Sequence, residues 1–284
     1  MLDLDDLIEQ ASRLEPLPPS ATRLTALVSS GAADIGEIAD VVAYDQALTT
    51  RLLQAANAAA SGGASPVHLA RDAVFRLGTA RVVALAIASS VKGMLARDLT
   101  PFGLAEGQLW AHSVAAAAAA ESIHGLAEYP LPTETFTAAL LHDIGKLVMS
   151  RHLSVEDLEW MHQARTSGRL SRLEAEVEVL GVHHGELGAV VAQHWELPER
   201  IVKGILHHHS PAQGFDAICD GVCLANLVAK QLEPRSNVDG PATDLPPPDP
   251  DSLDRIGLVP DQMAPLLQAA RAQYQAVRGR YDAV

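Results

Sequence analysis

The stretch Leu140-Leu-His-Asp-Ile-Gly-Lys-Leu-Val-Met149 decides how this chain is interpreted. Read as a helix, it belongs to an apolar stripe at core-facing spacing, formed by Phe136, Ala139, Leu140, Ile144 and Leu147. Asp143 follows Leu140 by three residues and precedes Leu147 by four, so its carboxylate falls within that stripe. A buried carboxylate must find a partner or lose its charge. We therefore expect His142 and Asp143 to belong to a buried polar cluster.

The composition favours a protein built from helices. Of the 284 residues, 48% are hydrophobic but only 4% are aromatic, so alanine, leucine, valine and isoleucine must make up most of the core. Alanine and leucine favour helices, and alanine also lets two helices approach closely. No segment alternates apolar and polar residues with the period of two that a half-buried strand requires. The sequence predicts an all-α fold.

The net charge, the apolar runs and the first residues of the sequence argue against several classes of protein. The formal net charge of -14 opposes nucleic-acid binding, which depends on lysine and arginine neutralising phosphates. The longest apolar run, residues 82–91, is about half as long as a membrane span, and the first six residues are acidic where a signal peptide is basic. Cys219 and Cys223 lack a CxxC pattern and are interpreted as small buried hydrophobes. We expect a cytoplasmic protein that binds neither nucleic acid nor a membrane.

Turn and capping residues divide the first part of the chain into helices. Residues 2–14 form an amphipathic helix that could pack on its own lobe or on a second subunit, which leaves the oligomeric state open. Asp34 and Glu37 have the spacing of a capping box at the start of a later helix. Residues 69–95 should form two helices that are broken around Gly78.

The second part of the chain carries the informative histidines. We predict helices over 105–124 with His112 and over 133–150 with His142, and a helix that begins at His184. A further helix should end in the run from His207 to His209, with Pro211 as its stop. The predicted domains are an N-terminal helical lobe over 1–100, a second helical lobe over 101–230, and a Pro/Asp-rich loop with a C-terminal helix over 231–284 that packs back on the domain.

Histidines from separate predicted helices could supply the partners of Asp143. A divalent metal binds histidine nitrogens and carboxylate oxygens that converge from different elements, as His112, His142, His184 and His208 or His209 could. A metal held there would lower the pKa of a bound water and so create a nucleophile for phosphorus. Lys146 follows His142 by one turn and could neutralise a phosphate oxygen.

Each of these residues also has a purely structural interpretation. The pair His142-Asp143 could fasten two helices, His112 could be a half-buried helix histidine, and Lys146 could be a solvated lysine. Consecutive helical residues point about 100° apart, so at least one ring of the triple histidine run must face solvent. The remaining histidines are expected at the surface or in loops: His68, His124, His152, His162, His183, His194 and His207.

A series of motifs extends over most of the chain: Leu17-Pro-Pro19, Tyr44-Asp-Gln-Ala-Leu48, Arg51-Leu-Leu53, Asn57, Arg76-Leu-Gly78, Leu109-Trp-Ala-His-Ser113, Ala139-Leu-Leu-His-Asp-Ile-Gly-Lys-Leu-Val148, Leu180-Gly-Val-His-His184, Trp195-Glu-Leu-Pro-Glu-Arg-Ile201 and His208-His-Ser-Pro211. Together they resemble the HDOD family, a bacterial signalling relative of the HD superfamily of metal-dependent phosphohydrolases. The resemblance implies a multi-helix HD-like bundle with an N-terminal helical lobe. It also implies a regulatory module that binds a partner protein or a small ligand.

The resemblance also assigns metal ligands by position. The set it implies consists of a late aspartate together with His112, His142 and Asp143, and a two-metal version adds His184 and one or both of His208 and His209. At the position of the late aspartate this chain has Asn226, which keeps a carbonyl oxygen but lacks the negative charge of a good ligand for a hard metal. We therefore expect a lowered affinity for a divalent metal such as Fe, Mn, Ni or Zn, or no metal at all.

Three functions are compatible with these residues. A non-catalytic signal-transduction module accounts for the incomplete ligand set and the N-terminal lobe, and we favour it. A metal-dependent phosphohydrolase acting on a nucleotide or phosphate ester is the second function, and it accounts for the retention of the histidines. The third is a protein that keeps a bound metal for structure or sensing, without turnover. The resemblance also disfavours cyclic-di-GMP hydrolysis. The cyclic-di-GMP phosphodiesterases of the same superfamily carry a Gly-Tyr-Pro signature after the His-Asp pair, whereas in this chain the only Tyr-Pro, Tyr129-Pro130, precedes the pair.

Overall fold

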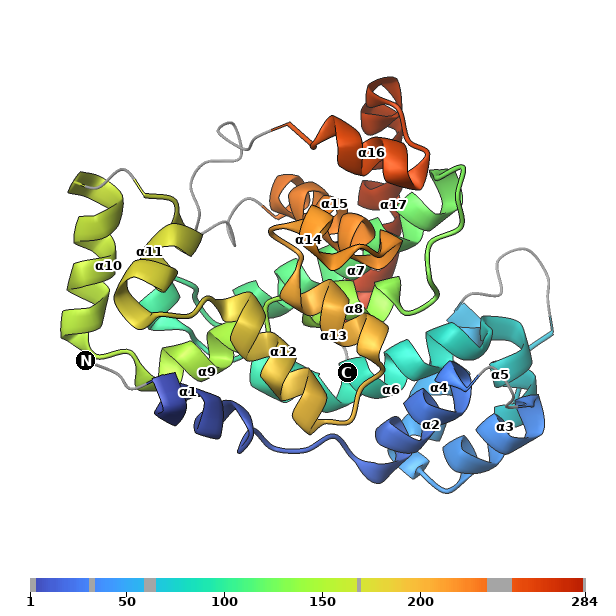
Figure 1. The fold of residues 1–284 in the computed structure, drawn as a ribbon. Helices are drawn as coiled ribbons and strands as arrows, with labels where there is room; N and C mark the ends of the chain where they lie inside the picture. Colours follow the sequence, from blue (N-terminus) through green and yellow to red (C-terminus); the bar gives the residue numbers. More distant parts are fainter. Residues whose placement is uncertain (1–3, 31–33, 59–64, 168–169, 234–246, 283–284) are drawn as a thin grey trace.

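The chain folds into helices and the turns between them (Figure 1). The computed structural model describes residues 4–30, 34–58, 65–167, 170–233 and 247–282. Within these ranges there is no strand, and an isolated antiparallel bridge joins Leu99 to Leu104. The predicted all-α fold is confirmed.

A first group of helices forms the N-terminal part of the molecule, where α2 packs on α3 and α6, and α4 packs on α5 and α6. The predicted capping box is present at the start of α3, where the Asp34 carboxylate accepts a hydrogen bond of 2.8 Å from the Glu37 N–H. Gly78 separates α5 from α6 as predicted, and its φ of +80° is a backbone conformation that favours glycine. The bounds are α2 Pro19–Ser29, α3 Ile35–Ala43, α4 Gln46–Ala58, α5 Ala70–Leu77 and α6 Thr79–Leu95.

Helix α7 is the central element of the second group. Its alanine run, residues 115–120, is buried, and these small side chains let α8, α15 and α17 pack closely along it. The short 3-10 helix η1 (Thr100–Phe102) lies between the two groups in sequence. The bounds are α7 Gln108–Leu126, α8 Thr135–Leu141, α9 Gly145–His152, α10 Val155–Ser167, α11 Arg172–Leu180, α12 His184–His194, α13 Glu199–Leu206, α14 Pro211–Gly214 and α15 Ala217–Leu232.

The C-terminal helix packs back on the second group. After α16 (Pro250–Ile256) and the 3-10 turn η4 (Pro260–Gln262), α17 (Met263–Asp282) lies against α7, as the warm colours in Figure 1 show. Leu266 and Ala270 of α17 are fully buried in this contact. The predicted Pro/Asp-rich loop lies largely outside the described residues, and its last part already belongs to α16.

The N-terminal helix α1 (Leu4–Ala11) packs on α9 and α12, which belong to the second group. Leu7 and Ala11 are fully buried there, whereas Ile8 of the same helix is 39% exposed. The Trp195 indole N–H donates a hydrogen bond of 3.1 Å to the Glu15 carbonyl, just after this helix. The helix therefore docks within its own chain.

Two helix boundaries differ from the prediction, and both lie at the histidines. The helix predicted over 133–150 is interrupted between α8 and α9, because the Ile144, Lys146 and Leu147 N–H groups bond to carbonyls three residues back instead of four. The run from His207 to His209 lies in a turn after α13, and Pro211 starts α14 instead of ending a helix.

No single helix in the described ranges combines the length and the apolar composition that crossing a membrane requires. Helices α5 and α6 meet that requirement only when taken together, and they are bent by 108° at the break between them.

Candidate metal centre

The predicted ligand residues come together at the middle of the second group. His112 lies on α7, His142 and Asp143 in the turn between α8 and α9, and His184 is the first residue of α12. The remaining residues are His208 and His209, in the turn after α13, and Asn226, on α15. All of these side chains are buried except that of His209, which is half-buried. Residues that are far apart in sequence thus form one cluster.

The first half of the cluster contains His112, His142, Asp143 and Asn226. The Nε2 atom of His112 lies 3.2 Å from His142 Nε2 and 3.2 Å from Asn226 Oδ1. Asp143 Oδ2 lies 3.3 Å from His142 Nε2 and 3.7 Å from His112 Nε2. Asn226 therefore occupies a place in the site, in agreement with its assignment by position.

The second half of the cluster contains His184, His208 and His209. The Nε2 atom of His184 lies 3.3 Å from His208 Nε2 and 3.0 Å from His209 Nε2. The other oxygen of Asp143, Oδ1, lies 3.2 Å from His184 Nε2 and 3.9 Å from His208 Nε2. Asp143 thus directs one oxygen toward each half of the cluster.

In three of these histidines the other ring nitrogen, Nδ1, forms a hydrogen bond outside the cluster. His142 Nδ1 donates to the Ala139 carbonyl at 2.7 Å, and His208 Nδ1 donates to the Ile205 carbonyl at 2.6 Å. His184 Nδ1 donates to a carboxylate oxygen of Glu176 at 2.6 Å. Carbonyl and carboxylate oxygens only accept hydrogen bonds, so each Nδ1 carries a hydrogen. Each ring, when it is neutral, therefore directs the lone pair of Nε2 into the cluster.

This donor set fits a divalent transition metal. Ligand atoms that lie about 2.1 Å from a common ion are separated from one another by roughly 3.0 to 3.4 Å. The nitrogen–nitrogen distances of 3.0 to 3.3 Å within the cluster fall in that range. The buried Nδ1 atom of His112 has no hydrogen-bond partner among the described residues. Imidazole and carboxylate together suit Fe, Mn, Ni or Zn.

Lys146 is buried, and its ammonium lies 2.8 Å from Asp143 Oδ2. The solvated alternative that the sequence allowed for this lysine is therefore wrong. The ammonium neutralises the carboxylate that both halves of the cluster share. A phosphate contact by Lys146 would require this ion pair to open.

The electrostatics of the cluster keep several of its histidines neutral. Burial lowers the pKa of His112 to about 3, and burial likewise holds the pKa values of His208 and His209 well below the usual range. Burial acts to raise the pKa of Asp143, yet the neighbouring His142 and Lys146 hold it well below its ordinary value. Neutral imidazoles and an ionised carboxylate are the forms that bind a metal.

His184 behaves differently because it lies between two carboxylates. Burial acts to lower its pKa, but the charge of Glu176 and the hydrogen bonds to Asp143 and Glu176 raise it above the ordinary value. His184 therefore holds a proton more tightly than an ordinary histidine does. Metal binding at its Nε2 atom must displace that proton.

Glu176 is a buried residue of the site that the sequence analysis missed. It is fully buried, and the same oxygen that accepts the His184 Nδ1–H accepts the backbone N–H of His184 at 3.0 Å. Arg172 lies one turn earlier on α11, with Nε 3.7 Å from the other carboxylate oxygen. The sequence contains a signal for its burial, because Glu176 shares a helix face with Leu173 and Leu180, at the spacing i, i+3 and i+7.

Replacing Glu176 by glutamine is expected to weaken metal binding about 10- to 100-fold, because this carboxylate orients the His184 ring and increases its basicity. Isothermal titration with Ni²⁺ or Mn²⁺ measures the effect. Glu178 lies on the same helix with an exposed side chain, so Glu178→Gln is the matched control and should leave the affinity unchanged. Equal affinity in both variants would show that Glu176 does not position His184.

Two aspartates near the start of α15, Asp216 and Asp220, do not contribute to the cluster. Asp220 accepts hydrogen bonds from Ser252 at 2.8 Å and from Arg255 at 2.7 Å, and Asp216 caps the helix and bonds to Arg200 at 3.2 Å. Neither replaces the carboxylate that is missing at Asn226.

The cysteines and most other histidines also lie outside the cluster. Burial raises the pKa of Cys219 to about 12 and that of Cys223 to about 11, so both thiols stay protonated. His183 is half-buried and caps α12 by accepting the Gly185 N–H at 3.1 Å, which differs from the predicted surface role. The other histidines expected at the surface are exposed or half-buried: His68, His124, His152, His162, His194 and His207.

A close backbone contact brings α9 and α12 together at the cluster. Gly145 is the first residue of α9, and a Cβ atom built on it would lie 1.9 Å from the His184 carbonyl oxygen and 2.7 Å from the Gly188 nitrogen. Only a residue without a side chain permits this approach. The glycine that follows the His-Asp pair therefore sets the distance between Asp143 and His184.

Solved structures with the same fold come from several bacteria. A candidate signal-transduction protein from Marinobacter aquaeolei VT8 is 23% identical with a TM-score of 0.70, over 99% of this chain and 62% of that one. A candidate phosphohydrolase from Shewanella amazonensis SB2B is 23% identical with a TM-score of 0.68, over 97% of both chains. An HDOD domain protein of unknown function from Geobacter sulfurreducens is 22% identical with a TM-score of 0.62, over 98% of this chain and 94% of that one. At these identities the likeness concerns the fold.

Sequence comparison places the chain in a family. An uncharacterized protein of Treponema pallidum (strain Nichols) is 22% identical over 230 residues, which are 78% of this chain but 44% of that protein. The chain thus spans less than half the length of this curated relative. The model of the HDOD domain matches residues 14–211, well over half of the sequence. The chain belongs to the HDOD domain family.

Proposed function

We propose that this HDOD protein is a non-catalytic regulatory module whose His/Asp cluster holds a divalent transition metal. The observation that carries the proposal is the set of Nε2 lone pairs that the hydrogen bonds of His142, His184 and His208 direct into one place. A cation shared by ligands from several helices would fix these helices relative to one another. The output would be recognition of a regulatory protein or a small ligand.

Three features support regulation over turnover. Asn226 supplies no negative charge where a carboxylate would strengthen metal binding. The ammonium of Lys146 already neutralises Asp143, whose two oxygens face the two halves of the cluster. His112, His142, Asp143, His184 and His208 are at most 4% exposed, whereas a catalytic metal keeps a position open to water and substrate.

A metal-dependent phosphohydrolase is the second candidate, and one observation favours it. The two oxygens of Asp143 face two separate groups of histidines, as a carboxylate does when it bridges two metal ions. Metal ions held there would supply a water of lowered pKa as the nucleophile. In that case Asp143 and the histidines would bind the metals, and Lys146 would have to leave Asp143 to meet a phosphate oxygen.

Metal analysis combined with activity assays separates the two candidates. Protein purified without added metal is analysed for Fe, Mn, Ni and Zn, and is then assayed with phosphate monoesters, phosphodiesters and nucleotides in the presence of each ion. Bound metal without turnover agrees with the proposal. Turnover that is lost when the metal is removed would establish the phosphohydrolase instead, and the absence of any metal binding would contradict both.

The variant Asn226→Asp tests whether the missing carboxylate limits metal binding. Because Oδ1 of Asn226 lies 3.2 Å from His112 Nε2, a carboxylate at this position would add a negative charge directly at the first half of the cluster. We expect about a tenfold or greater rise in Mn²⁺ affinity by titration calorimetry. Gln163→Glu, which adds a negative charge at an exposed glutamine of α10, is the matched control. Unchanged affinity in Asn226→Asp would remove position 226 from the ligand set.

A further inference from the structure

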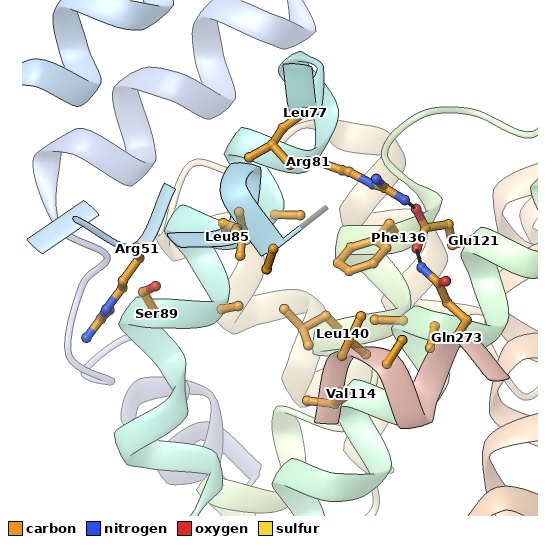
Figure 2. Close-up of a pocket in the computed structure, with 18 of the residues that line it drawn as sticks. Arg51, Leu77, Arg81, Leu85, Ser89, Val114, Glu121, Phe136, Leu140 and Gln273 are labelled. Atoms are coloured by element: carbon orange, nitrogen blue, oxygen red, sulfur yellow. Dashed lines mark hydrogen bonds and ion pairs between the residues drawn. The ribbon is translucent and has the colours of Figure 1, made fainter. Parts of the chain in front are cut away.

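A cavity of about 560 Å³ lies away from the His/Asp cluster, between α4 and α6 of the first group and α7, α8 and α17 (Figure 2). Its volume is within the range of pockets that enclose small molecules. Four large apolar side chains on its wall are only half-buried: Leu77, Leu85, Phe136 and Val277. Phe136 was expected in the core from its spacing, and it lines this cavity instead. A ligand would remove these apolar side chains from water.

The cavity exists because its helices present alanines to one another. Helices α4, α6, α7 and α17 each contribute at least one: Ala55, Ala58, Ala84, Ala88, Ala117, Ala118 and Ala276. Ala88 and Ala118 are each 1% exposed, so their methyl groups form part of a firm wall. A larger side chain at such a position would project into the cavity. The shape is thus a consequence of the alanine-rich sequence.

The polar residues of the cavity lie on two opposite sides (Figure 2). On one side the Glu121 carboxylate is bound on both oxygens, by Arg81 and by Gln273. On the other side lie Arg51 and Ser89, and neither side chain forms a hydrogen bond or ion pair with any residue that the structure describes. The first side is therefore neutralised internally, whereas the second has a positive charge to offer.

The charge of Arg51 is not consumed by Asp45, the acidic residue whose pKa it influences. Asp45 has a lowered pKa mainly because it accepts the Leu48 N–H, and the Ser20 hydroxyl also contributes, while Arg51 is the smallest of the causes. The Asp45 oxygens are occupied at 2.9 Å by Leu48 and at 2.7 Å by Ser20. The half-buried guanidinium of Arg51 therefore remains available at the rim of an apolar cavity.

We propose that this cavity binds an amphipathic monocarboxylate, with its hydrocarbon chain against the apolar wall and its carboxylate at Arg51 and Ser89. A guanidinium matches a carboxylate with two parallel hydrogen bonds, and a serine hydroxyl can donate a third. The apolar wall requires a hydrocarbon body and offers little to a highly charged ligand such as a nucleotide. This site is separate from the metal centre and does not depend on the proposed function of that centre.

Decanoate, decanol and decylamine are the probes, titrated into the full chain below their micelle concentrations and followed by calorimetry. Decanoate should bind, and the other two at least tenfold more weakly, because they lack the negative charge. In Arg51→Gln the affinity for decanoate should fall about 10- to 100-fold. The matched control is Arg71→Gln, which removes an exposed arginine from α5 outside the cavity and should change nothing.

A second variant tests the location independently of charge. Ala88→Leu should fill part of the cavity, retain a cooperative thermal unfolding transition and lose decanoate binding at least tenfold. Undiminished decanoate binding in Ala88→Leu would overturn the assignment to this cavity. Failure of decanoate to bind the unaltered protein, or equal binding of decanol, would overturn the proposed ligand class.

Discussion

Replacing Gly145 by alanine is expected to destabilise the protein by about 3 kcal/mol or more, a large part of the unfolding free energy of an ordinary domain. The added Cβ atom would lie 1.9 Å from the carbonyl oxygen of His184, and this backbone oxygen cannot rotate away as a side chain can. Helices α9 and α12 must then separate, which moves His184 away from Asp143. Chemical denaturation followed by circular dichroism measures the loss of stability.

Gly93 provides the matched control for this change. It lies exposed within α6, and a Cβ atom built there meets nothing within 4 Å. Gly93→Ala should therefore stabilise the protein by about 0.5 to 1 kcal/mol, since alanine favours the helix. If Gly145→Ala were as stable as Gly93→Ala, the close approach of α9 and α12 at the cluster would be wrong.

Replacing His142 by alanine is expected to abolish metal binding in the first half of the cluster, with a loss of affinity on the order of a hundredfold or more. His142 is fully buried, its Nδ1 atom is held by the Ala139 carbonyl, and its Nε2 atom faces both His112 and Asp143. Removal of an outer-shell partner alone typically costs 10- to 100-fold, and this change removes a ligand itself. Elemental analysis and calorimetric titration with Ni²⁺ or Mn²⁺ are the measurements.

Thermal unfolding gives a second readout of the same variant. A metal at 100 times its Kd stabilises the folded state by about 2.7 kcal/mol, so metal should raise the Tm of the unaltered protein and not that of His142→Ala. His124→Ala changes an exposed histidine of α7 and should keep the full metal-dependent shift. Identical shifts in the two histidine variants would show that the ions bind elsewhere.

Helix content and the cluster follow from short-range patterns and motif spacing. Alanine-rich helical stripes, the capping residue Asp34 and the break at Gly78 are local signals, and the structure agrees with each of them. The candidate ligand residues come together because each lies at or beside a core-facing position of a helix or in the turn that directly follows one. Asn226, which the family resemblance assigned to the ligand set, contacts His112, and its role as a ligand stays a prediction.

Other properties depend on contacts between distant segments that no local pattern encodes. The tight turn at His142 reflects how α8 and α9 meet, whereas the apolar spacing there suits a continuous helix equally well. Burial of Lys146 and Glu176 results from their pairing with Asp143 and His184, because a buried charge is stable only beside its partner. Phe136 has the periodicity of a core residue, but the alanines opposite it leave a cavity.

The position of α1 limits how the first group of helices can move. Helix α1 lies on α9 and α12, and the chain then crosses at Glu15 to α2–α6 and returns through η1 to α7. Within the described residues the first group is therefore connected to the second on both of its sides in sequence. A body attached by one flexible connection can swivel freely, whereas one attached at two places is restrained at both. The first group therefore cannot swing away from the second about the η1 connection alone unless α1 first detaches from α9 and α12.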